Sequence, residues 1–172
     1  NPAAFLLLSS FSFDSSVAGI FWTLTSGGKL VLPRKRIEQD TTALTDLINR
    51  EKVTHTLLLP TLYQAILNHA DARQLASLQN VMVAGEACPF ALIDQHYQTL
   101  PSTKLYNEYG PTEATVWCIA HEISSNEKGF VPIGKPIPNT EIYLLDKKMK
   151  PVPIGVRGDL YVGGLGVATG YW

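Results

Sequence analysis

The sequence predicts an α/β fold, in which a mainly parallel sheet flanked by helices is followed by a smaller β-rich unit with the character of a distorted barrel. Over residues 1–113, apolar runs of strand length alternate with helical segments, an order that builds parallel sheets through right-handed crossovers. Over residues 114–172, strand-like runs follow one another between Gly- and Pro-rich turns, without a helical pattern between them. We therefore expect one domain with two parts, 1–113 and 114–172.

The α/β part begins with an unbroken apolar run at 3–8, which is typical of a strand buried on both faces of a sheet. Polar residues then open an apolar helix over 17–25, and a glycine pair ends it. A second strand is expected over 29–33. Asp40 is placed to cap a helix that continues through about residue 52, because its side chain can accept a backbone N–H of the first turn.

The remaining elements follow from the same rules. Pro60 stops one strand and suits the first turn of the next helix, where its missing N–H is not needed. The expected helices are 61–70 and a segment that leads from Pro89 to about residue 100. The expected strands are 54–59, 81–84 and 104–109 in the first part, and 114–123, 140–146 and 159–162 in the second.

The composition narrows the functional classes. The 172 residues, of which 45% are hydrophobic, are enough for one compact core, and because the chain begins without Met we expect an internal fragment of a longer domain. A net charge of −1 gives no general attraction to nucleic acid or anionic membranes, and no apolar run reaches the length of a membrane span. Cys88 and Cys118 form neither a disulfide framework nor a metal pair, which favours a cytoplasmic location.

The stretch 107–113 combines an aromatic ring, a tight turn, a hydroxyl and a carboxylate directly after a predicted strand. Its Gly-Pro pair forces the turn, because glycine tolerates any φ and proline fixes its own. Such a turn can hold an adenine against the Tyr109 ring while Thr112 and Glu113 reach phosphate oxygens and a hard cation. Taken alone, the same residues also fit a loop with a solvated glutamate and a capping threonine.

Three further stretches accompany this one, at 11–16, 83–86 and 158–172. In that order, the four resemble the core motifs of adenylation domains of nonribosomal peptide synthetases, within the adenylate-forming (AMP-binding) enzyme superfamily. The resemblance covers the whole chain. It implies an ATP-dependent ligase that forms aminoacyl-AMP from ATP and an amino acid.

By the same resemblance, the aminoacyl group passes to the phosphopantetheine thiol of a carrier domain, and carrier and condensation domains of one synthetase are the partners in secondary metabolite biosynthesis. The phosphate loop of the family lies upstream of this chain, and its ribose-binding Asp, hinge and catalytic Lys lie downstream. The isolated chain is therefore expected to be inactive.

The resemblance also implies roles for individual residues. Asp14 matches the residue that pairs with the α-ammonium of the amino acid, although its position at a helix start also fits an N-cap. Glu113 matches a Mg²⁺ ligand and forms the catalytic pair with Thr112, which contacts phosphate. The residues assigned to ATP are Gly85, Glu86, Ala87, Asn107, Tyr109, Gly110 and Thr112.

The residues that match the lining of the family's specificity pocket are Asp14, Ser15, Ala18, Leu57, Met82, Ala84, Glu108, Val116 and Trp117. Leu57, Met82 and Val116 also fit simple core packing. Glu108 is the lone charge beyond Asp14, and it can accept a hydrogen bond from a phenol or pair with a cation. An aromatic amino acid such as tyrosine is favoured and a basic one is the alternative, while a Trp117 ring that fills the pocket favours a small substrate.

Two other functions remain to be separated from this one. A fatty or aryl acid:CoA ligase of the same superfamily is disfavoured by Asp14, because its substrates carry no amine. A non-catalytic nucleotide-binding module would keep the motifs as scaffold only. The closing glycine-rich run at 163–170 is one residue too long for a dinucleotide fingerprint, and we interpret it as a structural turn.

Overall fold

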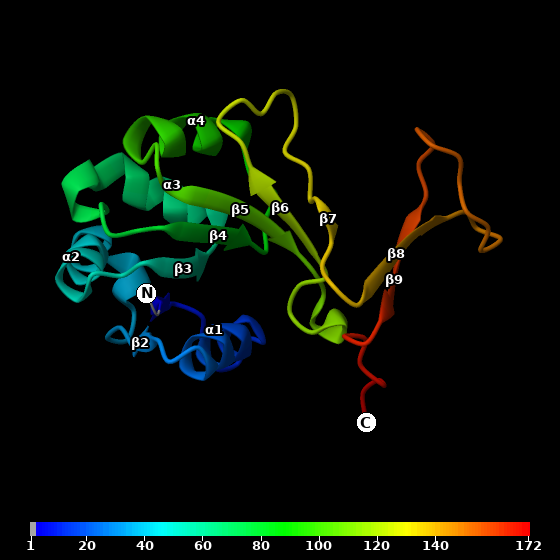
Figure 1. The fold of residues 1–172 in the computed structure, drawn as a ribbon, viewed down its shortest axis with the longest axis horizontal. Helices are drawn as coiled ribbons and strands as arrows, with labels where there is room; N and C mark the ends of the chain where they lie inside the picture. The colour runs from blue at the N-terminus through cyan, green and yellow to red at the C-terminus, as the bar shows by residue number, and fades with distance from the viewer. Residues whose placement is uncertain (1–2) are drawn as a thin grey trace.

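The structure is a computed structural model and describes residues 3–172. A seven-stranded sheet in the order β2-β1-β3-β4-β5-β6-β7 lies at its centre (Figure 1). Its strands are β1 (Ala4–Leu7), β2 (Lys29–Val31), β3 (His55–Leu58), β4 (Asn80–Ala84), β5 (Lys104–Tyr109), β6 (Ile119–Ile123) and β7 (Lys135–Pro136). The first five strands are parallel, and β6 and β7 are antiparallel to their neighbours. The predicted α/β class with a mainly parallel sheet is confirmed.

Helices cover both faces of this sheet, with α1 on one side and the other three on the opposite side (Figure 1). The helices are α1 (Ser15–Thr25), α2 (Thr41–Glu51), α3 (Pro60–His69) and α4 (Phe90–Thr99). The chain moves from β1 to β2 in one direction and then crosses back to β3, so right-handed crossovers place α1 apart from the rest. None of the described helices is both long and apolar enough to cross a membrane.

The core divides accordingly into two clusters of alternating strand residues. On the α1 face, Phe5, Leu7, Leu57 and Met82 pack together, and Trp117 is partly buried against them. The larger cluster on the opposite face takes the intervening strand residues and the apolar sides of the three remaining helices. The α1 face therefore has less covering material, which leaves room at the edge of the sheet.

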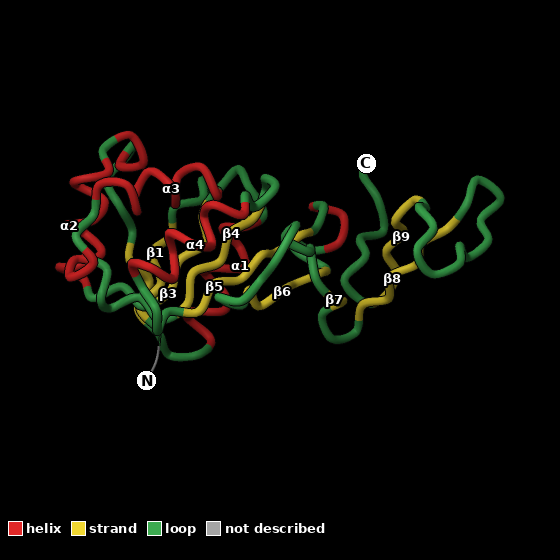
Figure 2. Tube along the Cα trace, turned by 90° about the horizontal axis from the view of Figure 1, so that it is seen from above, coloured by secondary structure: helices red, strands yellow, loops and turns green. Residues whose placement is uncertain are grey.

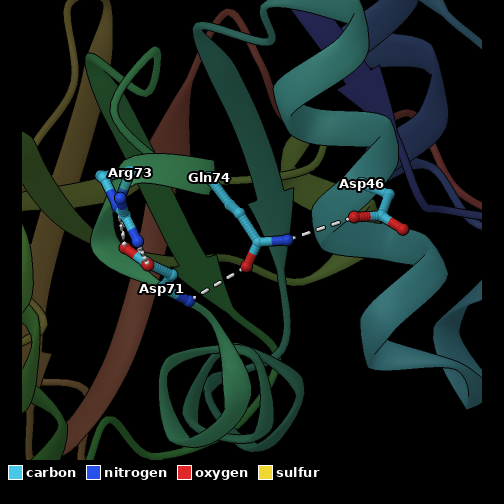
Figure 3. A network of polar contacts seen from close by, with 4 residues as sticks. All are labelled: Asp46, Asp71, Arg73 and Gln74. Atoms are coloured by element: carbon cyan, nitrogen blue, oxygen red, sulfur yellow. Dashed lines mark hydrogen bonds and ion pairs between the residues drawn. The ribbon is translucent and has the colours of Figure 1, made fainter.

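The connection between α3 and β4 is fixed at the amino-terminal edge of the sheet by the network in Figure 3. Asp71 and Gln74 form a capping box around the short helix η2 (Ala72–Gln74), and Arg73 pairs with the Asp71 carboxylate. Gln74 Nε2 also donates to Asp46 Oδ1 on α2 at 3.1 Å. The predicted cap of α2 is confirmed as well, because Asp40 Oδ1 accepts the Ala43 N–H at 3.0 Å.

The strands β8 (Thr140–Leu145) and β9 (Asp159–Gly164) form a separate antiparallel sheet, which lies to the side of the α/β part (Figure 2). Within residues 3–172 these two strands pair only with each other in a ladder, so no closed barrel is formed. The hairpin packs against the turn before β6 through a small apolar cluster of Ala114, Cys118, Ile119, Ile142, Leu160 and Val162.

The strand predicted from Ala114 begins only at Ile119. The reason is that Thr115 and Val116 both take positive φ, at 59° and 76°, and left-handed residues cannot continue a strand. β6 itself pairs with β5 and thereby extends the main sheet. The division of the domain into 1–113 and 114–172 stays a prediction.

Candidate ligand-binding site

A cavity of about 1150 Å³ opens at the carboxyl ends of β1, β3, β4 and β5. In Figure 1 the arrows of β3 and β4 point toward this edge. Parallel strands end at one edge of a sheet, and the loops that follow them gather there, which is where open α/β sheets bind ligands. The connection after β1 leads to α1 on one face of the sheet, whereas the connections after its neighbours β2 and β3 lead to α2 and α3 on the other face. The cavity lies at this point of divergence.

Most of the residues predicted for the site line this one cavity: Asp14, Ser15, Leu57, Ala84, Gly85, Glu86, Ala87, Asn107, Glu108, Tyr109, Gly110, Val116 and Trp117. Four predicted residues lie outside its lining, namely Ala18, Met82, Thr112 and Glu113. Met82 precedes Ala84 by two positions on β4, so it lies on the same face but deeper, and only 6% of it is exposed. The roles assigned to all these residues stay predictions.

Asp14 stands immediately before α1 and lines the cavity. Its carboxylate makes no capping hydrogen bond to the helix within the described residues. The local alternative, an N-cap, is therefore not realised. An aspartate that lines a cavity without capping the helix is available to a cationic group of a ligand.

Glu108 lies on β5 directly opposite Ala84 of β4, on the face that α1 covers. Its Oε2 is buried and has no hydrogen-bond partner in residues 3–172. Burial raises the pKa of this carboxyl to about 7, because the apolar surroundings disfavour its charged form. A buried carboxylate that the protein leaves unpaired is unusual, since burying such a group without a partner is costly.

The neighbours of Glu108 on β5, Asn107 and Tyr109, offer an amide and a ring to the same cavity. Tyr109 is 43% exposed, so its ring is accessible to a ligand. Asn107 is buried, and its Nδ2 donates to the Pro132 carbonyl at 2.9 Å, which holds the 129–133 loop against the cavity. Asn107 can still accept through Oδ1, so a flat base can bind between ring and amide.

The turn after β4 is shaped by backbone requirements. Gly85 has φ of +83°, a conformation that side chains other than glycine rarely adopt. Glu86 accepts from the Thr61 N–H at 3.2 Å and from the Thr61 hydroxyl at 3.1 Å. This carboxylate therefore anchors the turn to the start of α3.

The turn between β5 and β6 is held in a strained form. Thr115 and Val116 are both left-handed, and a β-branched residue at positive φ stores about 1–3 kcal/mol. The Cys118 N–H donates to the Tyr109 carbonyl at 2.9 Å and closes the loop. Gly110 packs so tightly that an added Cβ would lie 2.4 Å from Trp117 Cα. The strain is thus stabilised by a tight loop that directs Val116 and Trp117 into the cavity wall.

The closing glycine-rich run reaches back to the short helix η3 (Thr112–Ala114). The Ala168 N–H donates to the Glu113 carbonyl at 2.8 Å, and the Thr115 hydroxyl donates to the Gly166 carbonyl at 2.6 Å. The Tyr171 hydroxyl donates to Glu113 Oε1 at 3.0 Å. The run therefore fastens the turn that carries Thr112 and Glu113, a contact that the sequence did not indicate.

The charges of Asp14 and Glu113 both raise the pKa of the Tyr171 phenol. The pKa of Tyr171 is raised chiefly by its hydrogen bond to Glu113 and by the charge of that carboxylate, and to a smaller extent by the charge of Asp14. No group of three or more metal-ligating side chains occurs in the described range, so Mg²⁺ held by Glu113 would take its other ligands from phosphate and water.

Several lining residues were missed by sequence reasoning. They come from the loop after β1, from the connection between β2 and α2, from the end of β3, from the segments that lead into α3 and α4 and the first turns of these helices, and from the loop between β6 and β7. Only the Gly/Pro content of that last loop distinguished it in the sequence, and that content does not indicate where a loop folds. These residues are Leu8, Ser9, Ser10, Phe13, Glu38, Leu58, Leu59, Leu62, Cys88, Phe90, Gly129, Phe130, Val131 and Ile133.

A parallel sheet with such a cavity at its carboxyl edge defines the class of α/β proteins that bind ligands at this edge, and comparison with known proteins identifies the family. The profile of the AMP-binding enzyme family matches residues 2–172, and the chain belongs to this family. It is 40% identical over 168 residues to bacitracin synthase 3 of Bacillus licheniformis, a match that covers 98% of this chain and 3% of that protein.

Solved structures agree with this assignment. The nonribosomal peptide synthetase FmoA3, in its form bound to alpha-methyl-L-serine-AMP, superposes with a TM-score of 0.93 at 31% identity, over 99% of this chain and 20% of that one. A nonribosomal peptide synthetase protein that contains adenylation and PCP domains, bound to a vinylsulfonamide inhibitor, superposes with a TM-score of 0.88 at 28% identity. This match covers 99% of this chain and 30% of that one. The predicted resemblance to adenylation domains is confirmed, and the chain spans only a small part of these relatives.

Proposed function

We propose that this chain is the part of an adenylation domain that binds an amino acid and the adenine of ATP, within an enzyme that forms aminoacyl-AMP. One observation carries the proposal. The Asp14 carboxylate makes no capping bond and lies in the same cavity as the accessible ring of Tyr109. An ammonium beside Asp14 and a purine on Tyr109 then share one cavity.

The reaction joins the two ligands directly. A carboxylate oxygen of the amino acid attacks the α-phosphorus of ATP, a new P–O bond forms, and pyrophosphate leaves with the electrons of the broken bond. The step needs positioning and charge neutralisation more than an acid or base on the protein. Asp14 fixes the ammonium end, Asn107 and Tyr109 fix the base, and Thr112 contacts phosphate. Mg²⁺, when held by Glu113, supplies neutralisation of phosphate charge.

The wider role is also a proposal. The relatives include nonribosomal peptide synthetases, and one solved relative combines adenylation with PCP domains. Transfer of the aminoacyl group to the phosphopantetheine thiol of a carrier domain is therefore the expected second step, with condensation domains as further partners. The cytoplasmic location stays a prediction.

Amino-acid-dependent ATP–pyrophosphate exchange by the full-length protein tests the proposal. We expect exchange with at least one amino acid, and a loss of about 10²-fold or more in kcat/KM for Asp14→Asn, because the charged partner of the ammonium is gone. Glu113→Ala should raise the Mg²⁺ concentration needed for half-maximal exchange. Asp94→Asn, at an exposed position of α4, is a matched control that should behave as wild type.

Three outcomes would contradict the proposal in different ways. Exchange that depends on a carboxylic acid without an amine would indicate an acyl- or aryl-CoA ligase. ATP binding without any exchange would indicate a non-catalytic nucleotide-binding module. Unchanged kinetics of Asp14→Asn would remove the assigned role of Asp14 while leaving the family intact.

A further inference from the structure

Glu108 is the lining residue of the cavity whose buried side-chain oxygen has no hydrogen-bond partner in the described chain. Its Oε2 is buried without a hydrogen-bond partner, on the face of the sheet where Ala84 lies opposite and Trp117 packs nearby. A buried carboxylate oxygen that finds no partner in the protein is expected to find one in a ligand, because leaving it unpaired destabilises the site. This deepens the proposed function and rests on it.

The other charged groups of the cavity do not compensate Glu108. All the charged side chains among the described lining residues are carboxylates, namely Asp14, Glu38, Glu86 and Glu108. Glu86 is occupied by Thr61, and Glu38 is exposed on the helix η1 (Ile37–Gln39). With Asp14 reserved for the α-ammonium, Glu108 is left to meet the side chain of the substrate.

We propose that the activated amino acid carries a hydrogen-bond donor at the end of its side chain, and that Glu108 accepts this donor. The walls around Glu108 are apolar or aromatic, with Leu57, Ala84, Val116 and Trp117 in the lining. These walls contact the apolar part of the substrate side chain, and the end of that side chain meets the Glu108 carboxylate. Purely aliphatic side chains leave Glu108 unpaired, so this class is excluded.

Both a phenol and a cationic amine can donate a hydrogen bond to Glu108. Pairs of substrates that differ only in the presence of this donor therefore test the proposal. ATP–pyrophosphate exchange of the full-length protein is measured with tyrosine against phenylalanine, with lysine against norleucine, and with ornithine against norvaline. For the pair that the enzyme uses, we expect the donor-bearing member to exceed its isostere by about 10²-fold or more in kcat/KM, as in sites built around a substrate hydroxyl or amine.

Two variants assign the preference to Glu108. Glu108→Leu should reduce the difference within that pair to less than about tenfold, chiefly by improving the isostere. Glu108→Gln distinguishes the two sources, because an amide oxygen still accepts from a phenol but no longer neutralises a cation. Glu141→Gln changes an exposed carboxylate of β8 outside the cavity and should leave the preference unchanged.

The outcomes are separable. Equal use of both members of every pair, preference for the isostere, or a preference that survives in Glu108→Leu would overturn this inference. Absence of exchange with any amino acid would instead overturn the proposed function. If Glu108→Leu does not fold, the wild-type ratios together with Glu108→Gln still decide.

Discussion

Substitution of Glu108 by Gln should change the pH dependence of stability in a calculable way. The carboxyl is buried, and its folded-state pKa is raised from 4.5 to about 7. The folded state therefore holds the proton more tightly than the unfolded state does. The stability that the neutral carboxyl provides is fully present below pH 4.5, and it is lost as the pH rises through about 7.

The size of this effect follows from the shift. One pKa unit corresponds to about 1.4 kcal/mol, so a rise from 4.5 to about 7 corresponds to about 3 kcal/mol of unfolding free energy. The glutamine side chain cannot ionise and should not show this loss. The unfolding free energy of Glu108→Gln, relative to that of wild type, should thus rise by about 3 kcal/mol between low pH and pH 8.

Denaturant unfolding of the ligand-free full-length protein, measured from pH 4 to pH 8, provides the assay. The quantity compared is the difference in unfolding free energy between Glu108→Gln and wild type, in which groups common to both proteins cancel. These groups include Asp14 in the cavity and the residues Tyr106 and Glu122 near Glu108 on β5 and β6. Glu141→Gln should give a difference that is flat with pH. Parallel curves for Glu108→Gln and wild type would refute the reasoning.

Two further predictions concern the turn after β5. Gly110→Ala places a Cβ 2.4 Å from the nearest backbone carbon across the turn, so we expect a loss of about 1–3 kcal/mol in unfolding free energy; unchanged stability would show that the turn relaxes freely. Tyr171→Phe removes the hydroxyl that holds Glu113 Oε1, so the carboxylate loses a fixed orientation and the half-saturating Mg²⁺ concentration should rise a few-fold with little change in Tm. An unaltered Mg²⁺ dependence would mean that this contact does not position Glu113.

Each of these variants has a matched control within the chain. Gly163→Ala adds a Cβ whose nearest neighbour is 3.6 Å away, which is ordinary contact, so its stability should change little. Tyr143→Phe removes a hydroxyl that also donates to an exposed glutamate, Glu141, but on β8, and its Mg²⁺ dependence should be that of wild type.

The sequence predicted the α/β class and the succession of strands and helices along the chain. These features depend on local patterns, because apolar periodicity, an N-cap such as Asp40 and a first-turn proline such as Pro60 act within a few residues. Once the strands are parallel, the loops after them must meet at one edge, so the gathering of Asp14, Gly85 and Tyr109 in one cavity also followed from the chain alone.

The tertiary structure alone decided which side chains are available in that cavity. Alternation along β4 put Met82 and Ala84 on one face, but only the packing of Phe5, Leu7 and Leu57 showed that Met82 lies beneath the cavity. Likewise the local pattern allowed Asp14 to cap a helix, and only the structure showed its carboxylate uncapped.

The late part of the chain was determined least by its own sequence. The left-handed pair at 115–116 delays β6 until Ile119, after which that strand pairs with β5. Tyr171, directly after the glycine-rich closing run, returns to Glu113 from 58 residues away in the chain. Local sequence indicates which face of an element is buried, but partners distant along the chain decide what covers it, and these contacts form only when the fold brings them together.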